Sequence, residues 1–159
     1  QFAEEAGATA VFTPSELDIY PGQIEKIEAG SIGDIFEGKS RPGHFSGVLT
    51  VVKRLFDLVN PRHAVFGEKD FQQLFLIKKM VNDLKLPVNV VAAPTIRDSS
   101  NLALSSRNSR LSVEDKKIAQ VIYQALTQMV LRYLRLPQQY DSLFLPSRHA
   151  SPWCRKQIE

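Results

Sequence analysis

A lysine-bearing turn lies near the middle of the sequence, within the run His63-Ala64-Val65-Phe66-Gly67-Glu68-Lys69-Asp70-Phe71. Residues 64–66 predict a short buried strand and Phe71 begins a predicted amphipathic helix, so residues 67–70 form the turn between them. A turn from a parallel strand into a helix directs backbone N–H groups and the positive end of the helix dipole at one spot. Lys69 adds a full positive charge there, and Asp70 is placed to cap the helix. The pattern suits a phosphate at the carboxyl end of a sheet, although this stretch alone is more typical of an ordinary capped turn with a solvated lysine.

A second cationic loop lies further along the chain. Ser105, Ser106, Arg107 and Asn108 place two hydroxyls, a guanidinium and an amide next to one another. A guanidinium forks onto phosphate oxygens, and hydroxyls or loop amides bond the remaining lone pairs. Because a Ser-Ser-Arg run is common in loops, it indicates a phosphate site only in combination with the lysine-bearing turn.

Two further stretches carry polar groups suited to a small anionic substrate. Gln73 lies one helical turn after Asp70, on the side expected to face the strand ends, where its amide can bind a hydroxyl or a carboxylate. Residues 40–47 form a loop that is stiffened by a proline and holds Arg41 and His44. Constrained polar groups suit anion or partner contacts, but a lone loop arginine is more often only a solvated charge.

Hydrophobic periodicity predicts the elements that position these residues. Strands are expected at residues 8–12, 23–27, 64–66 and 88–93. Helices are expected at 48–59, 71–84 and 113–134, with short helical turns at 2–6 and 31–36. The alternation of strands and helices predicts an α/β fold, with a Rossmann-like parallel sheet and flanking helices, followed by a long helix and an irregular tail.

The helical period also predicts which side chains are buried and which residues cap the helices. In the first long helix the expected buried positions are Val48, Val51, Val52, Leu55, Phe56 and Val59. In the second they are Leu74, Phe75, Ile77, Met80, Val81 and Leu84, and in the third Ile118, Val121, Ile122, Ala125, Leu126, Met129 and Val130. Ser46 is the expected cap of the first helix, and Ser112 with Asp115 resembles a capping box for the third.

Composition indicates a globular protein with a hydrophobic core. The 159 residues are 43% apolar and 23% charged, which is enough for one domain, or one domain and part of another. A net charge of +3 suits an anionic substrate but falls short of the basic stripe of nucleic-acid-binding proteins. Single Cys154 excludes an intramolecular disulfide and a cysteine-based zinc cluster, and it fits a reducing cytosol. No apolar run reaches the ~18 residues of a membrane span, so we expect a cytoplasmic protein without membrane contact.

The character of the sequence changes at about residue 135. From there to the end no helical or strand period is present, and basic residues outnumber acidic ones. This composition is typical of an adaptable tail and not of a domain. A nucleic-acid-binding arm that stacks bases on Trp153 is disfavoured by the low net charge.

Three motifs resemble those of one family in their sequence, order and spacing. They are Ser40-Arg41-Pro42-Gly43-His44-Phe45, Phe66-Gly67-Glu68-Lys69-Asp70-Phe71-Gln72-Gln73-Leu74 and Leu102-Ala103-Leu104-Ser105-Ser106-Arg107-Asn108. Together they resemble the pantothenate synthetase (pantoate–β-alanine ligase) family of the nucleotidyltransferase superfamily. The resemblance covers about residues 3–130, and each motif alone is only suggestive, whereas the three together are highly specific. Asn101 stands where the family often has glycine, in a turn that tolerates asparagine.

The resemblance implies a reaction in two steps. ATP and pantoate would form pantoyl adenylate and pyrophosphate, and β-alanine would then attack the acyl adenylate to release AMP. The implied ATP-binding residues are Gly67, Glu68, Lys69, Asp70, Ile96, Leu104, Ser105, Ser106 and Arg107. Lys69 would neutralise phosphate charge during adenylation, and the 105–107 loop would hold the β- and γ-phosphates, so Lys69, Ser105, Ser106 and Arg107 are the expected catalytic residues. Magnesium is expected with ATP, without an assigned ligand.

The resemblance also implies a pantoate site and a partner. Gln73 would bind pantoate, and Val48, Val52 and Phe66 would form apolar walls for its gem-dimethyl carbon. A homodimer is expected because the family usually forms one, with no nucleic acid and no membrane as partner. Attack by a carboxylate on the α-phosphorus builds negative charge, so preorganised cations and N–H groups are the main catalytic need.

Some parts that the family has are missing from the sequence. Its His-x-Gly-His loop and a second pantoate-binding glutamine would precede Gln1, and none of the three histidines, His44, His63 and His149, lies in that pattern. After Val130 the resemblance to the family's small C-terminal domain ends. The expected domains are residues 1–111, the C-terminal half of the nucleotide-binding domain, and residues 112–159, the start of the C-terminal domain with a basic tail. We expect this chain alone to have little or no turnover; the alternative is a non-catalytic nucleotide- or partner-binding fragment.

Overall fold

The computed structural model describes residues 2–134, so the tail predicted from about residue 135, with Trp153 and Cys154, lies outside the described residues. The chain divides into two compact units, Gln1–Thr95 (unit 1) and Ile96–Glu159 (unit 2), and each is described by itself. Among the described helices, none is long and apolar enough to cross a bilayer.

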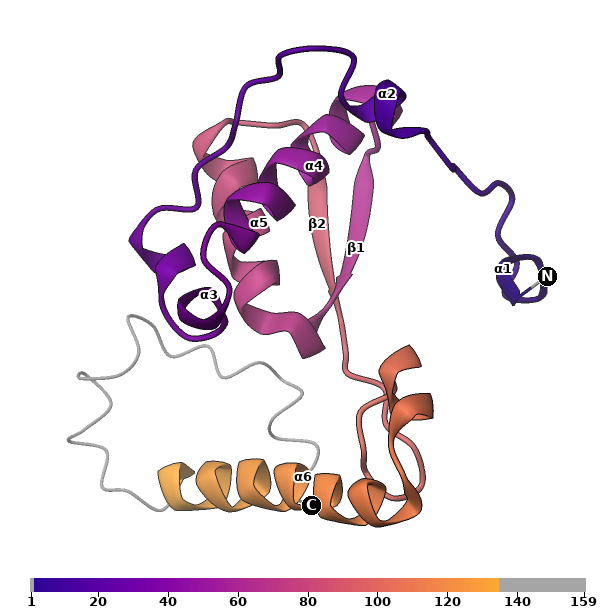
Figure 1. The fold of residues 1–159 in the computed structure, drawn as a ribbon, viewed down its shortest axis with the longest axis vertical. Helices are drawn as coiled ribbons and strands as arrows, with labels where there is room; N and C mark the ends of the chain where they lie inside the picture. Colours follow the sequence, from indigo (N-terminus) through magenta and orange to yellow (C-terminus); the bar gives the residue numbers. More distant parts are fainter. Residues whose placement is uncertain (1, 135–159) are drawn as a thin grey trace. The chain divides into compact units, whose positions relative to one another are not determined.

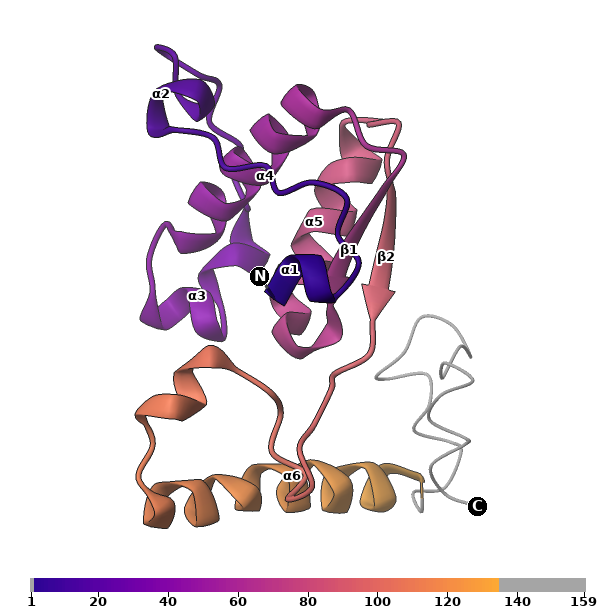
Figure 2. The same cartoon turned by 90° about the vertical axis from the view of Figure 1, so that its right-hand side faces the viewer.

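A parallel sheet organises unit 1. Strand β1 (His63–Gly67) pairs with β2 (Asn89–Ala93), with His63 opposite Asn89 and Gly67 opposite Ala93. Helices α4 (His44–Val59) and α5 (Phe71–Asp83) cover one face of this sheet (Figures 1 and 2). The strands predicted at 64–66 and 88–93, the helices predicted at 48–59 and 71–84, and the parallel α/β arrangement are confirmed.

Five short helical elements complete unit 1. They are α1 (Phe2–Glu5), α2 (Glu16–Ile19), the 3-10 helix η1 (Ser31–Asp34), α3 (Glu37–Ser40) and the 3-10 helix η2 (Glu68–Asp70). The helical turns predicted at 2–6 and 31–36 are therefore confirmed, and α2 and α3 were not foreseen. Helix α2 begins with a capping box in which the Ser15 hydroxyl lowers the pKa of Asp18.

The core of unit 1 lies between α4, α5 and the inner face of the sheet. Its fully buried side chains come from the two helices and include Phe45, Leu76 and Ile77. The partly buried side chains that pack against it are Ile27, Ile32, Val52, Phe56, Phe66, Leu86 and Val90. On β1, Ala64 and Phe66 are half-buried while Val65 between them is 66% exposed, so the sheet buries one face.

Two of the four predicted strands are absent. Residues 8–12 and 23–27 form no strand, and the side chains of Val11 and Phe12 are exposed. Alternation of apolar residues makes a strand only where a neighbouring strand accepts the backbone hydrogen bonds. In the second segment, side chains of α4 replace that neighbour, because Ile27 N–H donates to Thr50 Oγ1 at 3.0 Å.

The predicted cap of α4 is wrong. The helix begins at His44, after Gly43 in the left-handed conformation, so Ser46 lies inside its first turn. The Ser46 hydroxyl is buried, accepts a hydrogen bond from Ala29 N–H and donates to a Glu28 carboxylate oxygen. The hydroxyl therefore holds a preceding loop against the helix and does not close the helix end.

The predicted buried stripes are right in part for unit 1. On α4 the buried apolar residues are Phe45 and Leu49, whereas Val59 is 52% exposed. On α5, Leu74, Ile77 and Met80 are buried as predicted, Leu76 replaces Phe75 in the core, and Phe75 and Leu84 are exposed. The inward face of α5 is thus rotated by about one residue, from Phe75 to Leu76, and on α4 the most deeply buried side chains lie toward its N-terminus.

Unit 2 has no buried residue in its described part. It contains an isolated antiparallel bridge between Arg97 and Ala103, the 3-10 helix η3 (Ser106–Arg110) and the helix α6 (Val113–Leu134). Helix α6 is confirmed, and so is its cap, because Asp115 N–H donates to Ser112 Oγ at 3.0 Å. The buried stripe predicted on α6 is wrong; its exposed members are Ile118, Val121, Ile122, Ala125, Leu126, Met129 and Val130. An amphipathic period predicts that a face can be buried, and the described residues place nothing over this one.

Candidate functional site

The lysine-bearing turn joins the end of β1 to the start of α5. Gly67 is the last residue of β1, residues 68–70 form η2, and α5 begins at Phe71. The first N–H groups of a helix have no partner within it, so they and the dipole favour an anion at this place. Lys69 is exposed and makes no ion pair with any residue of 2–134. Its charge is therefore available to a ligand.

The predicted capping role of Asp70 is wrong. Asp70 occupies the position before α5, but its side chain makes no capping hydrogen bond. A capping residue usually has an extended backbone, whereas Asp70 has φ −96° and ψ 60° because it ends a 3-10 turn that runs directly into the helix. Its carboxylate is exposed beside Glu68 and Lys69.

Two adjacent glutamines in the first turn of α5 have different surroundings. The Gln72 carboxamide donates to Ile32 O at 2.8 Å and to Ile35 O at 2.9 Å, and it accepts from Glu37 N–H at 3.2 Å. Gln73 is half-buried, and its amide bonds no other residue of the described chain. Successive helical side chains point about 100° apart, so only one of the two is engaged by the loop at 32–37. Sequence reasoning had singled out Gln73 and passed over Gln72.

The three predicted apolar wall residues differ in how much of their surface is already packed. Phe66 points inward from β1 and meets the Phe56 ring edge-on, at 6.3 Å between centroids and 75° between planes. Val52 packs against the core from α4, and Val48 is half-buried on the same helix. All three lie in unit 1 with Gln73 and the 67–70 turn.

The loop before α4 is held by a close backbone approach and an ion pair. A Cβ on Gly38 would overlap the carbonyl oxygen of Gly33, so this contact requires glycine. Arg41 Nη1 lies 2.8 Å from Glu37 Oε1 in an exposed pair. His44 is the first residue of α4, and its ring centroid lies 5.1 Å from that of Phe45. Arg41 therefore lies between α3 and α4, but the loop predicted at residues 40–47 is shorter than expected, because Ser40 ends α3 and His44 already belongs to α4.

In unit 2 a single carboxylate organises the turn before the arginine-bearing loop. One oxygen of Asp98 accepts from Ser100 Oγ at 2.6 Å, Ser100 N–H at 2.8 Å and Leu102 N–H at 3.1 Å. The Ser100 hydroxyl is the main reason that the pKa of Asp98 lies below its ordinary value. Asn101 adopts the left-handed conformation with φ 67°, which explains why an asparagine or glycine is suited there.

The two residues of unit 2 predicted to flank the nucleotide, Ile96 and Leu104, lie opposite each other on the segments that enter and leave this turn. Leu104 N–H donates to Ile96 O at 2.9 Å, so the two residues are paired through the backbone. Their side chains are 65% (Ile96) and 53% (Leu104) exposed. Arg97, which sequence reasoning missed, lies 4.9 Å above the Tyr123 ring and joins the turn to α6. Nothing in the sequence spacing marked this pair.

The serine–arginine loop is built from its own hydrogen bonds. Ser105 Oγ accepts from Arg107 N–H at 3.2 Å and caps η3. Ser106 is exposed, and its carbonyl accepts from Ser109 Oγ at 2.8 Å. The Arg107 guanidinium is exposed and has no ion pair with a residue of 2–134. Like Lys69 in unit 1, it is a cation next to backbone donors with its charge open to a ligand.

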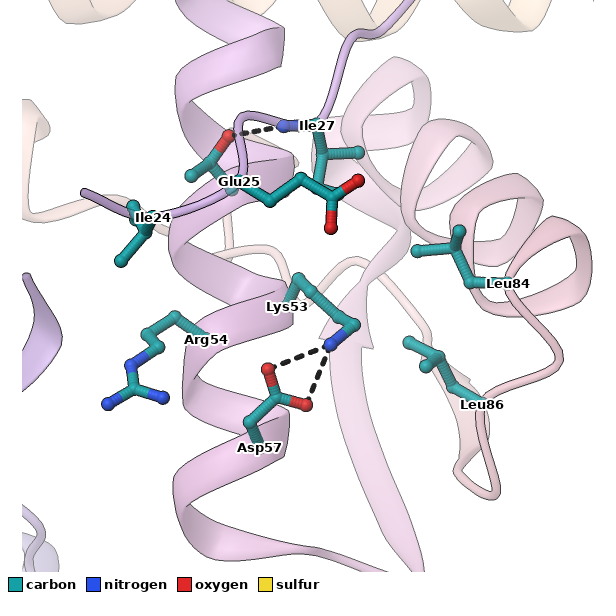
Figure 3. A pocket seen from close by; sticks show the side chains of 9 residues that line it. Ile24, Glu25, Ile27, Lys53, Arg54, Asp57, Leu84 and Leu86 are labelled. Carbon is teal, nitrogen blue, oxygen red and sulfur yellow. Dashed lines mark hydrogen bonds and ion pairs between the residues drawn. The ribbon is translucent and has the colours of Figure 1, made fainter.

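Depressions exist in both units. In unit 2, one of about 430 Å³ lies beside the serine–arginine loop and is lined by Leu104, Ser105, Lys116 and Lys117 among others. In unit 1, one of about 460 Å³ contains the Lys53–Asp57 ion pair of α4, with Glu25, Leu84 and Leu86 around it (Figure 3). The unit 1 depression contains none of the predicted site residues, and two of its four charged lining residues, Lys53 and Asp57, pair with each other. The unit 2 depression is the one that matches a predicted loop.

Within the described residues, no group of three or more His, Cys, Asp or Glu side chains is arranged to hold a metal ion. Contact of both Lys69 and Arg107 with one triphosphate stays a prediction.

Comparison with known proteins identifies one family. The family model described as pantoate-beta-alanine ligase matches residues 1–149. A pantothenate synthetase of Nitrosococcus oceani is 49% identical over 130 residues, which are 80% of this chain and 46% of that protein. One from Porphyromonas gingivalis is 47% identical over 150 residues, which are 93% of this chain and 53% of that protein. The chain thus spans about half the length of the curated relatives that it matches.

Solved structures agree with the sequence relatives. A pantothenate synthetase of Thermus thermophilus has a TM-score of 0.75 and 48% identity, with 81% of this chain and 48% of that chain covered. The pantoate-beta-alanine ligase of Francisella tularensis, solved with beta-gamma ATP and beta-alanine, has a TM-score of 0.72 and 46% identity, with 80% of this chain and 49% of that chain covered. The α/β fold predicted from the sequence is therefore the nucleotidyltransferase-like fold of these neighbours.

Proposed function

Since this chain belongs to the pantoate–β-alanine ligase family, we propose that its residues serve the ATP-dependent joining of pantoate and β-alanine through a pantoyl-adenylate intermediate. The main supporting observation is that Lys69 is exposed, has no ion-pair partner in residues 2–134 and lies in the turn between a parallel strand and a helix N-terminus. The family match covers this turn, since it extends over residues 1–149. Because relatives are about twice as long, the complete reaction is proposed for the full-length protein and the binding roles below for this chain.

The first step needs positive charge at the phosphates. The pantoate carboxylate oxygen would attack the α-phosphorus of ATP, the bond from the α-phosphorus to the bridging oxygen would break, and pyrophosphate would leave. Negative charge grows on the phosphate oxygens, so donors that are already in place lower the barrier. We assign this role to Lys69, with Gly67, Glu68 and Asp70 as the nucleotide-contacting turn. Ser105, Ser106 and Arg107 would hold the β- and γ-phosphates, with Ile96 and Leu104 beside the nucleotide.

Residues of unit 1 would orient the pantoate substrate. The amide of Gln73 can bond the hydroxyl or carboxylate of pantoate, and its position next to the engaged Gln72 supports this choice. Val48, Val52 and Phe66 would contact the gem-dimethyl carbon. Holding two anions in reacting geometry supplies much of the rate enhancement of such a ligase.

In the second step, the β-alanine amine would attack the acyl carbon, and AMP would leave with the bonding electrons while the amine loses a proton. Magnesium would accompany the triphosphate as a charge-neutralising ion. We assign it no ligand and derive no step from it. A homodimer and a cytoplasmic location belong to the same proposal.

Calorimetry with ATP tests the nucleotide roles. Lys69→Ala and Arg107→Ala should each weaken ATP binding by about tenfold or more, since each removes a charge-assisted bond to phosphate of roughly 1.5–3 kcal/mol. Matched controls are Lys78→Ala and Arg110→Ala, which remove an exposed cation of the same type from α5 and η3. Both controls should bind ATP within twofold of the parent chain.

Equal ATP affinity in the parent, Lys69→Ala and Arg107→Ala proteins would refute the phosphate site. If both variants weaken binding, the double variant decides whether the two cations serve one ATP. A coupling free energy between the two substitutions indicates that both cations contact one triphosphate. A stoichiometry of two ATP molecules per parent chain would contradict a shared ligand.

A further inference from the structure

One side chain of α5 bonds this helix to the loop before α4 through three hydrogen bonds. Gln72 uses both N–H donors of its carboxamide, on Ile32 O at 2.8 Å and Ile35 O at 2.9 Å. Its oxygen accepts from Glu37 N–H at 3.2 Å. A carboxamide has two donors and one acceptor oxygen, so no part of the group is left without a partner.

The bonds at Ile35 and Glu37 enclose an unfavourable backbone conformation. Phe36, between them, has φ 51° and ψ −118°, a combination that non-glycine residues rarely adopt. Phe36 is 79% exposed, so burial of its side chain contributes little to stabilising this conformation. Backbone strain persists only where surrounding contacts impose it. The two Gln72 bonds act on the peptide groups on either side of Phe36, and they supply such contacts.

The same hydrogen bonds connect this loop to the first turn of α5, where the candidate site lies. Glu37, whose N–H is held by Gln72, forms the 2.8 Å ion pair with Arg41. Gln72 itself lies in the first turn of α5, directly after the Gly67–Asp70 turn and beside Gln73. Loss of the carboxamide would leave two carbonyls and one N–H without partners. Ile32, whose carbonyl Gln72 holds, packs against the same core as Val52 and Phe66, two of the proposed apolar walls.

We propose that Gln72 is a positioning residue for the pantoate side of the site: its carboxamide fixes the segment 31–41 on the first turn of α5, beside Gln73 and the proposed apolar walls. This inference rests on the proposed function, because pantoate is the ligand of that site. We assign Gln72 no contact with the reacting atoms.

The test compares three variants of the chain. Gln72→Ala removes all three hydrogen bonds, and Gln72→Glu keeps an acceptor for Glu37 N–H but faces two carbonyls without a donor. Thr50→Ala is the matched control, since it removes a side-chain partner of Ile27 N–H and of Ser46 O in the same unit without touching the loop. Circular dichroism melting curves establish that each variant is folded.

Two measurements are made on each protein. Amide hydrogen exchange should be at least tenfold faster at residues 31–37 in Gln72→Ala and Gln72→Glu, and unchanged there in Thr50→Ala. Pantoate affinity, measured by calorimetry, should fall at least tenfold in both Gln72 variants, while ATP affinity stays within twofold. Thr50→Ala should bind both ligands within twofold of the parent chain, even if its melting temperature falls.

The outcomes separate this proposal from the proposed function. Unchanged exchange at residues 31–37 in Gln72→Ala overturns the fixing of the loop. Faster exchange with parental pantoate affinity overturns the positioning role, and so does an equal loss of affinity in Thr50→Ala, because the effect would then follow stability alone. A parent chain that binds no pantoate overturns the proposed function of this site, and with it the role of Gln72 in binding, whereas the exchange result still decides whether Gln72 holds the loop.

Discussion

The two units hold their candidate residues in place by different means. In unit 1 the lysine-bearing turn connects β1 to α5. The inward side chains Leu76 and Ile77 of α5 are almost completely buried. In unit 2 the serine–arginine loop stands on a turn and a helix that bury no described residue. There the geometry comes from side-chain-to-backbone hydrogen bonds of Asp98, Ser105 and Ser112.

This difference affects how rigidly each of the two cations proposed to bind phosphate, Lys69 and Arg107, is held. Core packing resists displacement because each lost contact costs burial free energy. Local hydrogen bonds at an exposed turn compete with water and open at low cost. We therefore expect the Lys69 turn to be stable without ligand and the Arg107 loop to gain most of its order on binding.

The largest expected effect is a difference in stability between substitutions in the core of unit 1 and on the exposed helix of unit 2. Ile77→Ala, at a position with 0% exposure, should lower the free energy of unfolding of unit 1 by about 2–5 kcal/mol. Leu126 on α6 is 48% exposed. Leu126→Ala should therefore change the free energy of unfolding of unit 2 by less than about 1 kcal/mol. Denaturant unfolding followed by residue-resolved amide exchange measures both. Comparable losses in the two units would remove the contrast.

A second test concerns the packed loop of unit 1. Gly38→Ala should destabilise unit 1 by about 1–3 kcal/mol, because the new methyl group would overlap Gly33 O and the loop must shift. Gly47→Ala is the control. Its Cβ would meet nothing within 4 Å, and alanine should stabilise α4 there by about 0.5–1 kcal/mol. Thermal melting of both proteins measures the opposite signs; two shifts of the same sign would contradict the close-contact explanation.

The next prediction concerns the side-chain cap at the start of α6 in unit 2. Ser112→Ala should cost α6 about 1 kcal/mol, since the hydroxyl that accepts from Asp115 N–H is lost. Ser112→Thr keeps a hydroxyl and should restore most of that stability. Exchange rates of the amides in the first turn of α6 are the measurement, and equal rates in the alanine variant and the parent would show that the cap contributes nothing.

The smallest effect is a pH dependence confined to the turn at residues 98–102. The pKa of Asp98 is lowered in the folded chain, mainly by the Ser100 hydroxyl, so the ionised form is the one that the fold favours. The resulting stabilisation is present above the unfolded pKa of about 3.9 and is lost as the pH falls through the lower folded value.

Nuclear magnetic resonance titration of the Ser100 and Leu102 amides from pH 6 to about 2 measures this loss, in the acidic range where Asp carboxyls protonate. Asp98→Asn should abolish the transition. A transition of the same midpoint in that variant would assign it to another carboxyl group.

Sequence reasoning located the central elements because their signals are local. The 64–66 and 88–93 strands and the 71–84 helix follow from short apolar runs and a helical period, and the 67–70 turn follows from their junction. The motifs then named the family, which the comparisons confirm.

Other features depend on contacts that a linear pattern does not contain. The segment 23–27 alternates like a strand, yet the N–H group of Ile27 bonds a side chain of α4. The apolar period of α6 is genuine, yet its face is exposed. Gln72 looks the same as Gln73 in the sequence, and only the positions of Ile32, Ile35 and Glu37 distinguish the two. Candidate site residues could therefore be proposed from residue type and motif, whereas the residues that support them could not.

The long sequence separation of the Gln72 contacts has a consequence for the order in which unit 1 folds. Gln72 and its three partners are 35 to 40 residues apart in the chain, so these hydrogen bonds close a large loop. Closing such a loop costs entropy that only prior packing of α4 against α5 can offset. The segment at 31–41 should therefore be the last part of unit 1 to acquire its native conformation, with φ-values near zero at Gln72, and the first to lose it when the protein is transiently opened.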